Sequence, residues 1–181
     1  TTATTVFVNN DIPLVDIVSY SNVTCAGTCN GAATSSVTGG VTPYTYLWTS
    51  GETTVNATAL CVGNASVTVT DGNGCNTSDA VTLNAPPPIS GTGAVANPVT
   101  CFGASDGSLS VTVSGGISPY AYSWNNGQSA STATGLNSGS YTVIVSDAYS
   151  CSKSFTYALS QPTLVTLSGS STNATCGTPD G

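Results

Sequence analysis

The sequence predicts an all-β protein, because it repeats itself and because each copy reads as short strands separated by turns. Shifting the 181-residue sequence by 76 positions aligns Cys25 with Cys101 and Trp48 with Trp124, without a gap between them. Apolar residues alternate over short segments, and no segment has the period of a helix. Six or seven short strands in about 75 residues predict tandem immunoglobulin-like β-sandwich repeats.

The second copy shows its strand signals in order along the chain. They are AVANPV (94–99), SLSVTVS (108–114), SPYAYSW (118–124), a weaker SASTATG (129–135), SYTVIVSD (140–147) and SFTYALS (154–160). Turn-forming residues separate these segments at Asp106-Gly107, Gly115-Gly116, Asn126-Gly127, Ser138-Gly139 and from Asp147 onward. Val143 and Val145 share one face of their strand, the alternation expected of a half-buried strand.

The repeat frame divides the chain into four parts. They are the closing strand of a preceding repeat (1–16), a first immunoglobulin-like repeat (17–88), a second (89–163) and the start of a further repeat (164–181). The last part is assigned because ATCGTPDG (174–181) matches VTCFGASDG (99–107) with one residue deleted. Prolines 86–88 and Pro162 mark the seams, where a strand ends and an extended linker begins. We therefore expect the chain to be an excerpt of a longer array.

The composition excludes several classes of partner. The chain has one basic residue, Lys153, against eight carboxylates, and its net charge is −7. Nucleic acids and anionic membrane surfaces are bound through Lys and Arg, so neither is an expected partner. No apolar stretch is long enough to be inserted into a membrane. Seven Cys and no His indicate disulfides rather than zinc, and hence an oxidising, exported setting.

The repeat also predicts how the cysteines pair. Two cysteines recur with the same separation in both copies, whereas Cys29 and Cys61 align with Ser105 and Asn137 and are absent from the second copy. Cysteines that appear together and vanish together are most simply partners. The expected disulfides are Cys25–Cys75, Cys29–Cys61 and Cys101–Cys151. Cys176 aligns with the first cysteine of a pair and is expected to be unpaired within this segment.

One difference between the copies concerns a turn. Leu136-x-x-Gly139-x-Tyr141 has the form of a tyrosine corner, in which the hydroxyl is bonded to the backbone. The first copy has Ala65 in place of the tyrosine, and its additional Cys61 lies in the same turn. The hypothesis is that the added disulfide replaces the missing corner.

The aromatic residues are the main candidates for a binding site. Tyr44, Tyr46 and Trp48 share one face of a strand, and so do Tyr120, Tyr122 and Trp124 in the second copy. Such a row could stack sugar rings, as in carbohydrate-binding modules. The favoured interpretation is that Trp48 and Trp124 are core residues, like the buried Trp of immunoglobulin domains, because a requirement of the fold recurs in every module.

Catalytic chemistry is not expected, and neither is a cofactor or a metal. Without His there is no ordinary Ser or Cys triad, and the chain is not expected to be an enzyme. The sparse carboxylates Asp71, Asp147, Asp106 and Asp180 lie at strand ends or before Gly, where Asp forms turns. Calcium at a repeat seam, held by Asp11 or Asp16, is an open alternative, although no dense oxygen-ligand motif is present.

Three motifs together carry a family resemblance: GG-x-x-PY-x-Y-x-W, then L-x-x-G-x-Y-x-V-x-V-x-D, then a closing Cys. They resemble the SprB-type repeat of large cell-surface adhesins of gliding and other Bacteroidota, over residues 17–163. The first copy departs from the pattern at Ala65. The resemblance implies export by the type IX system, display on the cell surface, and service in attachment and gliding.

The sequence thus predicts a structural and adhesive stalk segment of a giant extracellular repeat protein or surface filament. Its expected partners are neighbouring repeats of the same chain or filament, with surface polysaccharide as an open alternative. Two other functions stay open: an array of carbohydrate-binding modules, and a filament subunit completed by strand exchange between neighbours.

Overall fold

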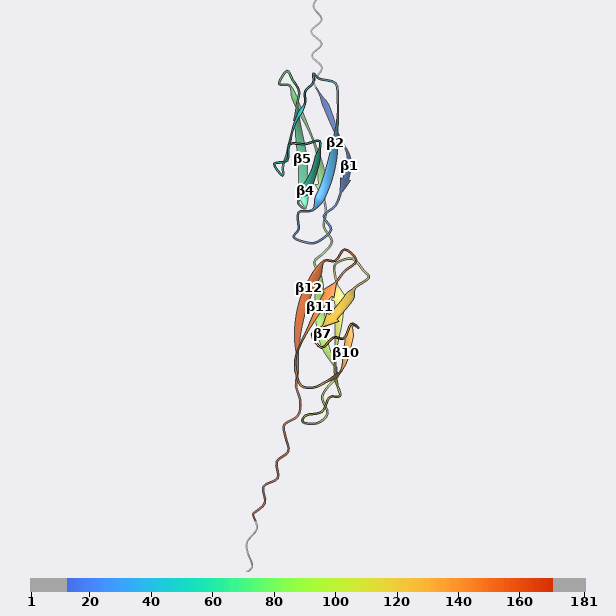
Figure 1. Cartoon of the computed structure of the whole chain (residues 1–181), viewed down its shortest axis with the longest axis vertical. Coiled ribbons are helices and arrows are strands. Elements are labelled where there is room, and N and C mark those ends of the chain that lie inside the picture. Colours follow the sequence, from blue (N-terminus) through green and yellow to red (C-terminus); the bar gives the residue numbers. More distant parts are fainter. Residues whose placement is uncertain (1–12, 171–181) are drawn as a thin grey trace, which may run out of the picture.

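The computed structural model describes residues 13–170, which form two β-sandwiches placed end to end along one long axis (Figure 1). Module 1 contains β1 (Leu14–Ser21), β2 (Gly31–Thr38), β3 (Thr45–Trp48), β4 (Asn56–Leu60), β5 (Gly63–Thr70) and β6 (Asn76–Leu83). Module 2 contains β7 (Ser90–Asn97), β8 (Gly107–Ser114), β9 (Ala121–Trp124), β10 (Thr132–Leu136), β11 (Gly139–Ser146) and β12 (Ser152–Leu159). Within the described part, no helix has the length and apolarity needed to cross a membrane.

Each module is a pair of three-stranded antiparallel sheets. In module 1 the sheet orders are β1-β2-β4 and β3-β5-β6, and in module 2 they are β7-β8-β10 and β9-β11-β12. Among the described strands, no sheet combines strands of both modules. Two facing antiparallel sheets with this strand order form an immunoglobulin-like sandwich, so the fold class predicted from the sequence is confirmed.

Alternating residues fill the space between the sheets. In β11, Val143 and Val145 are buried, whereas Ile144 between them is 47% exposed. Trp124 lies in the centre of module 2 and donates its Nε1–H to the carbonyl oxygen of Ala130 at 2.8 Å. Because the indole N–H has this partner, the ring is buried without an unpaired donor.

The two modules differ in which strand carries an apolar side chain at one pair of equivalent positions. In module 2, Gly91 on β7 lies under the ring of Phe155, and a Cβ on Gly91 would lie 2.8 Å from that ring. The corresponding residues of module 1 are Val15 and Asp79. Module 1 therefore has its apolar side chain of this pair on β1, whereas module 2 has it on β12, where it covers a glycine of β7.

The module boundaries differ from those expected. β1 begins at Leu14 and pairs with β2 in the register Leu14↔Thr38, so residues 14–16 belong to module 1 and not to a preceding repeat. The proline that ends the seam is here Pro13, just before the strand. Residues 84–89 form the linker between β6 and β7. Residues 1–12 and 171–181, including Cys176, Asp11 and Asp180, lie outside the described residues.

Candidate functional site at the module junction

The aromatic rows lie against the cores. Trp48 is 2% exposed, and Tyr44 and Tyr46 are partly buried beside it. The hydroxyl of Tyr44 donates to the carbonyl oxygen of Gly39, so the tyrosine holds the Gly-Gly turn that precedes its own strand. Module 2 repeats this arrangement with Trp124, Tyr120 and Tyr122, and Tyr120 donates to the carbonyl oxygen of Gly115. Neither row is an open platform of rings, which weighs against sugar stacking at these residues.

Within residues 13–170 the cysteines form two disulfides, and one of them joins the modules. Cys29 pairs with Cys61 within module 1, as the sequence predicts. Cys25 of module 1 pairs with Cys151 of module 2 across a sequence separation of 126, with their Cα atoms 5.6 Å apart. The predicted pairs Cys25–Cys75 and Cys101–Cys151 are therefore wrong, and Cys75 and Cys101 carry free thiols.

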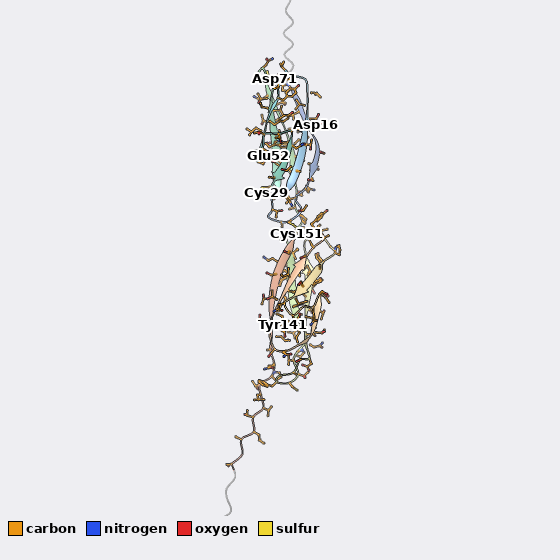
Figure 2. All side chains as sticks on the ribbon, in the orientation of Figure 1. Asp16, Cys29, Glu52, Asp71, Tyr141 and Cys151 are labelled. Carbon is orange, nitrogen blue, oxygen red and sulfur yellow. A yellow bond between two sulfur atoms is a disulfide. The ribbon has the colours of Figure 1, made fainter. Side chains whose placement is uncertain are left out.

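The reason for the correction is the length of the sandwich. Cys25 lies in the loop between β1 and β2, whereas Cys75 ends the turn between β5 and β6. Figure 2 shows Asp71, which begins that turn, at the end of module 1 far from the junction, while Cys29 of the other loop lies near the junction. A strand of eight residues spans about 26 Å, far beyond the roughly 6 Å that a disulfide allows between Cα atoms.

Hydrogen bonds hold the loop that carries Cys25. Thr24 donates its N–H to Oδ1 of Asn30 at 3.0 Å, and the amide nitrogen of Asn30 donates to the Thr24 hydroxyl at 2.6 Å. Thr28 donates its N–H to the carbonyl oxygen of Cys25 at 3.2 Å. These bonds fix Cys25 at the end of module 1 that faces module 2.

Asp147 holds the turn that carries Cys151. Its carboxylate accepts N–H hydrogen bonds from Ile117 and Cys151 at 3.0 Å and from Tyr149 at 2.9 Å. Burial alone would raise the pKa of Asp147, but these backbone donors outweigh it and lower the pKa below its usual value. The ionised carboxylate therefore orders the turn from which Cys151 reaches module 1 (Figure 2).

The linker is attached to both modules. On the side of module 1, Val23 donates its N–H to the carbonyl oxygen of Asn84, and Asn84 donates its N–H to Oδ1 of Asn22. On the side of module 2, Gly116 donates its N–H to the carbonyl oxygen of Pro87 at 2.7 Å. Gly116 has φ +62°, and a Cβ there would lie 2.8 Å from the Ile89 side chain, so this close approach requires glycine.

Two hollows lie beside the disulfide. One, of about 400 Å³, is lined by residues of both modules and the linker, among them Cys25, Pro88, Asp147 and Lys153. The other is of about 520 Å³ and includes Tyr149, which is 57% exposed. Within the described residues, no group of three or more Cys, Asp or Glu side chains could hold a metal ion. Asp16, proposed above for calcium, is exposed on β1.

With this geometry established, the family comparison can be stated. The family described as SprB repeat matches the chain at two places, residues 17–53 and 93–129. The chain is therefore similar to the SprB repeat at both places. Each match starts within the first strand of a module and ends after the buried Trp, so each covers the first three strands of one sandwich. No curated protein sequence matches the chain.

Several solved structures resemble these SprB repeats. The three N-terminal domains of the bacteriophage RB49 highly immunogenic outer capsid protein (Hoc) are 17% identical, with a TM-score of 0.48 over 81% of this chain and 58% of that one. A C-terminal fragment of intimin, solved with the intimin-binding domain of its translocated receptor, is 15% identical, with a TM-score of 0.42 over 81% and 64%. A Dscam structure is 14% identical, with a TM-score of 0.37 over 85% and 47%.

Sequence reasoning missed the residues that position the junction disulfide. The signal was present in the SprB repeats themselves, because Thr24 and Asn30 recur as Thr100 and Asp106 around the next loop cysteine. In the second repeat Thr100 donates its N–H to Oδ1 of Asp106 at 3.1 Å. A threonine just before a cysteine, with an Asn or Asp a few residues after it, indicates a loop that side-chain hydrogen bonds hold in one conformation.

The turn aspartates predict acid lability. Because the pKa of Asp147 is lowered in the folded state, its contribution to stability is fully present above the unfolded pKa of about 3.9 and is lost as the pH falls through the lower, folded value. We expect the melting temperature of module 2 to fall below about pH 4, and Asp147→Asn to lower it at neutral pH and to weaken its pH dependence. Calorimetry from pH 2 to 7 measures this, with Asp16→Asn as an exposed control. An unchanged pH profile in Asp147→Asn would contradict the prediction.

Proposed function

We propose that the chain is a structural and adhesive stalk segment of a cell-surface protein built from tandem SprB repeats. Its disulfides fit an oxidising, extracellular location, and its two sandwiches follow one another along a single axis (Figure 1). Neighbouring repeats of the same chain are its direct partners. Service in surface attachment and gliding belongs to the proposal through the SprB repeat, and the carboxylates serve folding rather than catalysis.

The junction disulfide is the observation that carries the proposal. Tension applied to the two ends of the chain enters module 1 along β1 and leaves module 2 along β12. The Cys25–Cys151 bond connects the loop after β1 to the position just before β12. A continuous covalent path therefore runs along one already extended strand, through the disulfide, and along a second extended strand.

This path protects the remaining strands from tension. The disulfide closes a loop with a sequence separation of 126, and this loop contains β2 to β11. While the bond is intact, force on the termini cannot lengthen the chain by unfolding those strands. Independent modules joined by a short linker would instead unfold one after another and move freely, the usual expectation for small inter-domain contacts.

Pulling single molecules of the full chain by its two ends tests this proposal. We expect the oxidised chain to show no unfolding steps from the closed loop. The variant that combines Cys25→Ser and Cys151→Ser is expected to expose that loop to tension, and so is full reduction. Under full reduction the sequence separation of 126 is expected to add roughly 420–450 Å of contour length, at about 3.3–3.6 Å per residue.

A matched control separates the two disulfides. The combination of Cys29→Ser and Cys61→Asn retains the junction bond, so its oxidised form is expected to stay short. If the oxidised native chain lengthened by the full contour length of the closed loop, the proposed path of tension through the disulfide would be contradicted. Antibodies to the folded modules are expected to label intact cells, and labelling only after permeabilisation would contradict the cell-surface location.

A further inference from the structure

The free thiols of the described residues, Cys75 and Cys101, occupy the outer ends of the two-module unit. Cys75 stands at the position in module 1 that Cys151 has in module 2, and Cys101 stands at the position that Cys25 has in module 1. Cys75 therefore lies in the turn at the far end of module 1, and Cys101 lies in the loop at the far end of module 2. Each is the counterpart of one half of the observed junction bond.

The turn of Cys75 has the same hydrogen-bond framework as that of Cys151. Asp71 accepts N–H hydrogen bonds from Cys75 at 2.9 Å and from Val41 and Asn73 at 3.0 Å. Asp71 also donates its own N–H to the carbonyl oxygen of Cys75 at 2.9 Å, as Asp147 does to Cys151 at 3.0 Å. The free thiol of module 1 is thus presented by the same ordered turn as the bonded one.

The loop of Cys101 likewise reproduces that of Cys25. Ala104 donates its N–H to the carbonyl oxygen of Cys101 at 3.1 Å, the counterpart of the bond from Thr28 to Cys25 at 3.2 Å. The clamp between Thr100 and Asp106 takes the place of that between Thr24 and Asn30. Both free thiols are exposed or half exposed, so neither is buried as a core residue.

Apolar side chains at the two outer ends of the unit are exposed, and the counterpart of one of them is packed at the observed junction. Val165 of the segment after β12 is 93% exposed, whereas its counterpart Ile89 packs against the core of module 2. Phe102, next to Cys101, is 53% exposed, and Val41, above the turn of Cys75, is 45% exposed. A further module seated on Val165, as module 2 is seated on Ile89, would cover this end.

We propose that Cys75 and Cys101 form disulfides with the SprB repeats on either side, so that every junction of the array carries the bond seen between Cys25 and Cys151. Cys101 pairs with the turn cysteine of the following repeat, and Cys75 pairs with the loop cysteine of the preceding one. Each bond has the 126-residue separation of the observed bond when the repeats stay in register. This proposal rests on the tandem array of the proposed function and extends it from one junction to all.

Formation of each bond needs a two-electron oxidant, for which we name a disulfide-bearing thiol oxidoreductase or oxidised glutathione. The thiolate of one cysteine attacks a sulfur of that disulfide and releases one thiol. The thiolate of the partner cysteine then attacks the mixed disulfide and releases the second thiol. Two protein thiols become one disulfide, their two electrons reduce the oxidant to two thiols, and the two protons lost as the thiolates form are taken up by the released thiols.

An array in which residues 14–165 occur twice in succession tests the proposal. This segment contains all twelve strands and both closed cores, and the repetition keeps the 76-residue register. After oxidation with oxidised glutathione, free thiols are alkylated and the linkages are mapped by peptide mass spectrometry. We expect Cys25–Cys151 in each copy and, across the central junction, Cys101 of the first copy bonded to Cys75 of the second.

The same array contains its controls. Cys75 of the first copy and Cys101 of the second have no neighbour and are expected to be alkylated. A spacer of roughly ten Gly and Ser residues after Val165 is expected to reduce the central bond severalfold, because it destroys the register. Alkylation of both central thiols beside intact Cys25–Cys151 bonds would overturn this proposal and leave the stalk function standing. Cys25–Cys75 bonds would overturn both.

Discussion

Replacing Trp124 with alanine is expected to lower the free energy of unfolding of module 2 by about 3–5 kcal/mol, the usual loss for a large aromatic residue of a core. Trp124 is 3% exposed, and its Nε1–H is bonded to the carbonyl oxygen of Ala130 at 2.8 Å. A module of this size has only roughly 4–10 kcal/mol of stability in total. Most of module 2 is therefore expected to open at moderate temperature.

Hydrogen exchange followed by mass spectrometry measures this effect for each module separately. Peptides of β11 are expected to lose protection in Trp124→Ala, while peptides of module 1 keep theirs. Ser123→Ala is the matched control, because Ser123 is the exposed neighbour on the opposite face of the strand. A Trp124→Ala chain that kept its protection but lost affinity for a polysaccharide would contradict the core role and restore the sugar-binding alternative.

Much of the fold was predictable because the same pattern of strands and turns occurs in both modules, so that each copy supports the assignment made in the other. Turn residues and alternation located five of the six strands of module 2 to within a few residues, and even the weak segment SASTATG (129–135) overlaps β10 in all but its last residue. The first half of β7 was missed because SGTG has no apolar residues. It forms a strand because its backbone pairs with β8 and because Phe155 and Tyr157 cover Gly91 and Gly93 from β12.

The error in the disulfides has a clear physical origin. Two cysteines that recur at a fixed spacing show only that their pairing is periodic. A partner in the same module and a partner in the next module satisfy this periodicity equally well. The choice depends on which end of the sandwich each cysteine occupies, and a turn after β5 lies opposite a loop after β1 in this topology. Strand direction, rather than spacing, therefore decides between the two pairings.

The two modules stabilise the equivalent turn, between β4 and β5 in module 1 and between β10 and β11 in module 2, by different means. In module 2, Tyr141 donates its hydroxyl to the carbonyl oxygen of Asn137 at 3.1 Å, as the tyrosine-corner motif predicts. In module 1 the counterpart of Asn137 is Cys61, which is bonded to Cys29. A surface hollow of about 320 Å³, lined by Cys61 and Ala65 among others, lies where module 1 has no tyrosine ring.

Converting Cys29 to Ser and Cys61 to Asn is expected to lower the free energy of unfolding of module 1 by about 3–4 kcal/mol, since the bond closes a loop with a sequence separation of 32. Adding Ala65→Tyr to this pair rebuilds the corner of module 2. Its ring can enter the hollow beside Cys61, and its hydroxyl can reach the carbonyl oxygen at position 61. We expect this addition to restore about 1–2 kcal/mol.

Denaturant unfolding of the double and triple variants measures this exchange, and Ala65→Phe in the triple variant separates the hydroxyl from the ring. If the tyrosine corner can replace the Cys29–Cys61 disulfide, the tyrosine variant is more stable than the phenylalanine variant by the contribution of one hydrogen bond, roughly 1 kcal/mol. A tyrosine variant no more stable than the double variant would mean that the disulfide has a different role. In a stalk that role would be mechanical, because the Cys29–Cys61 bond also removes a closed loop from the length that module 1 can release once the junction bond is reduced.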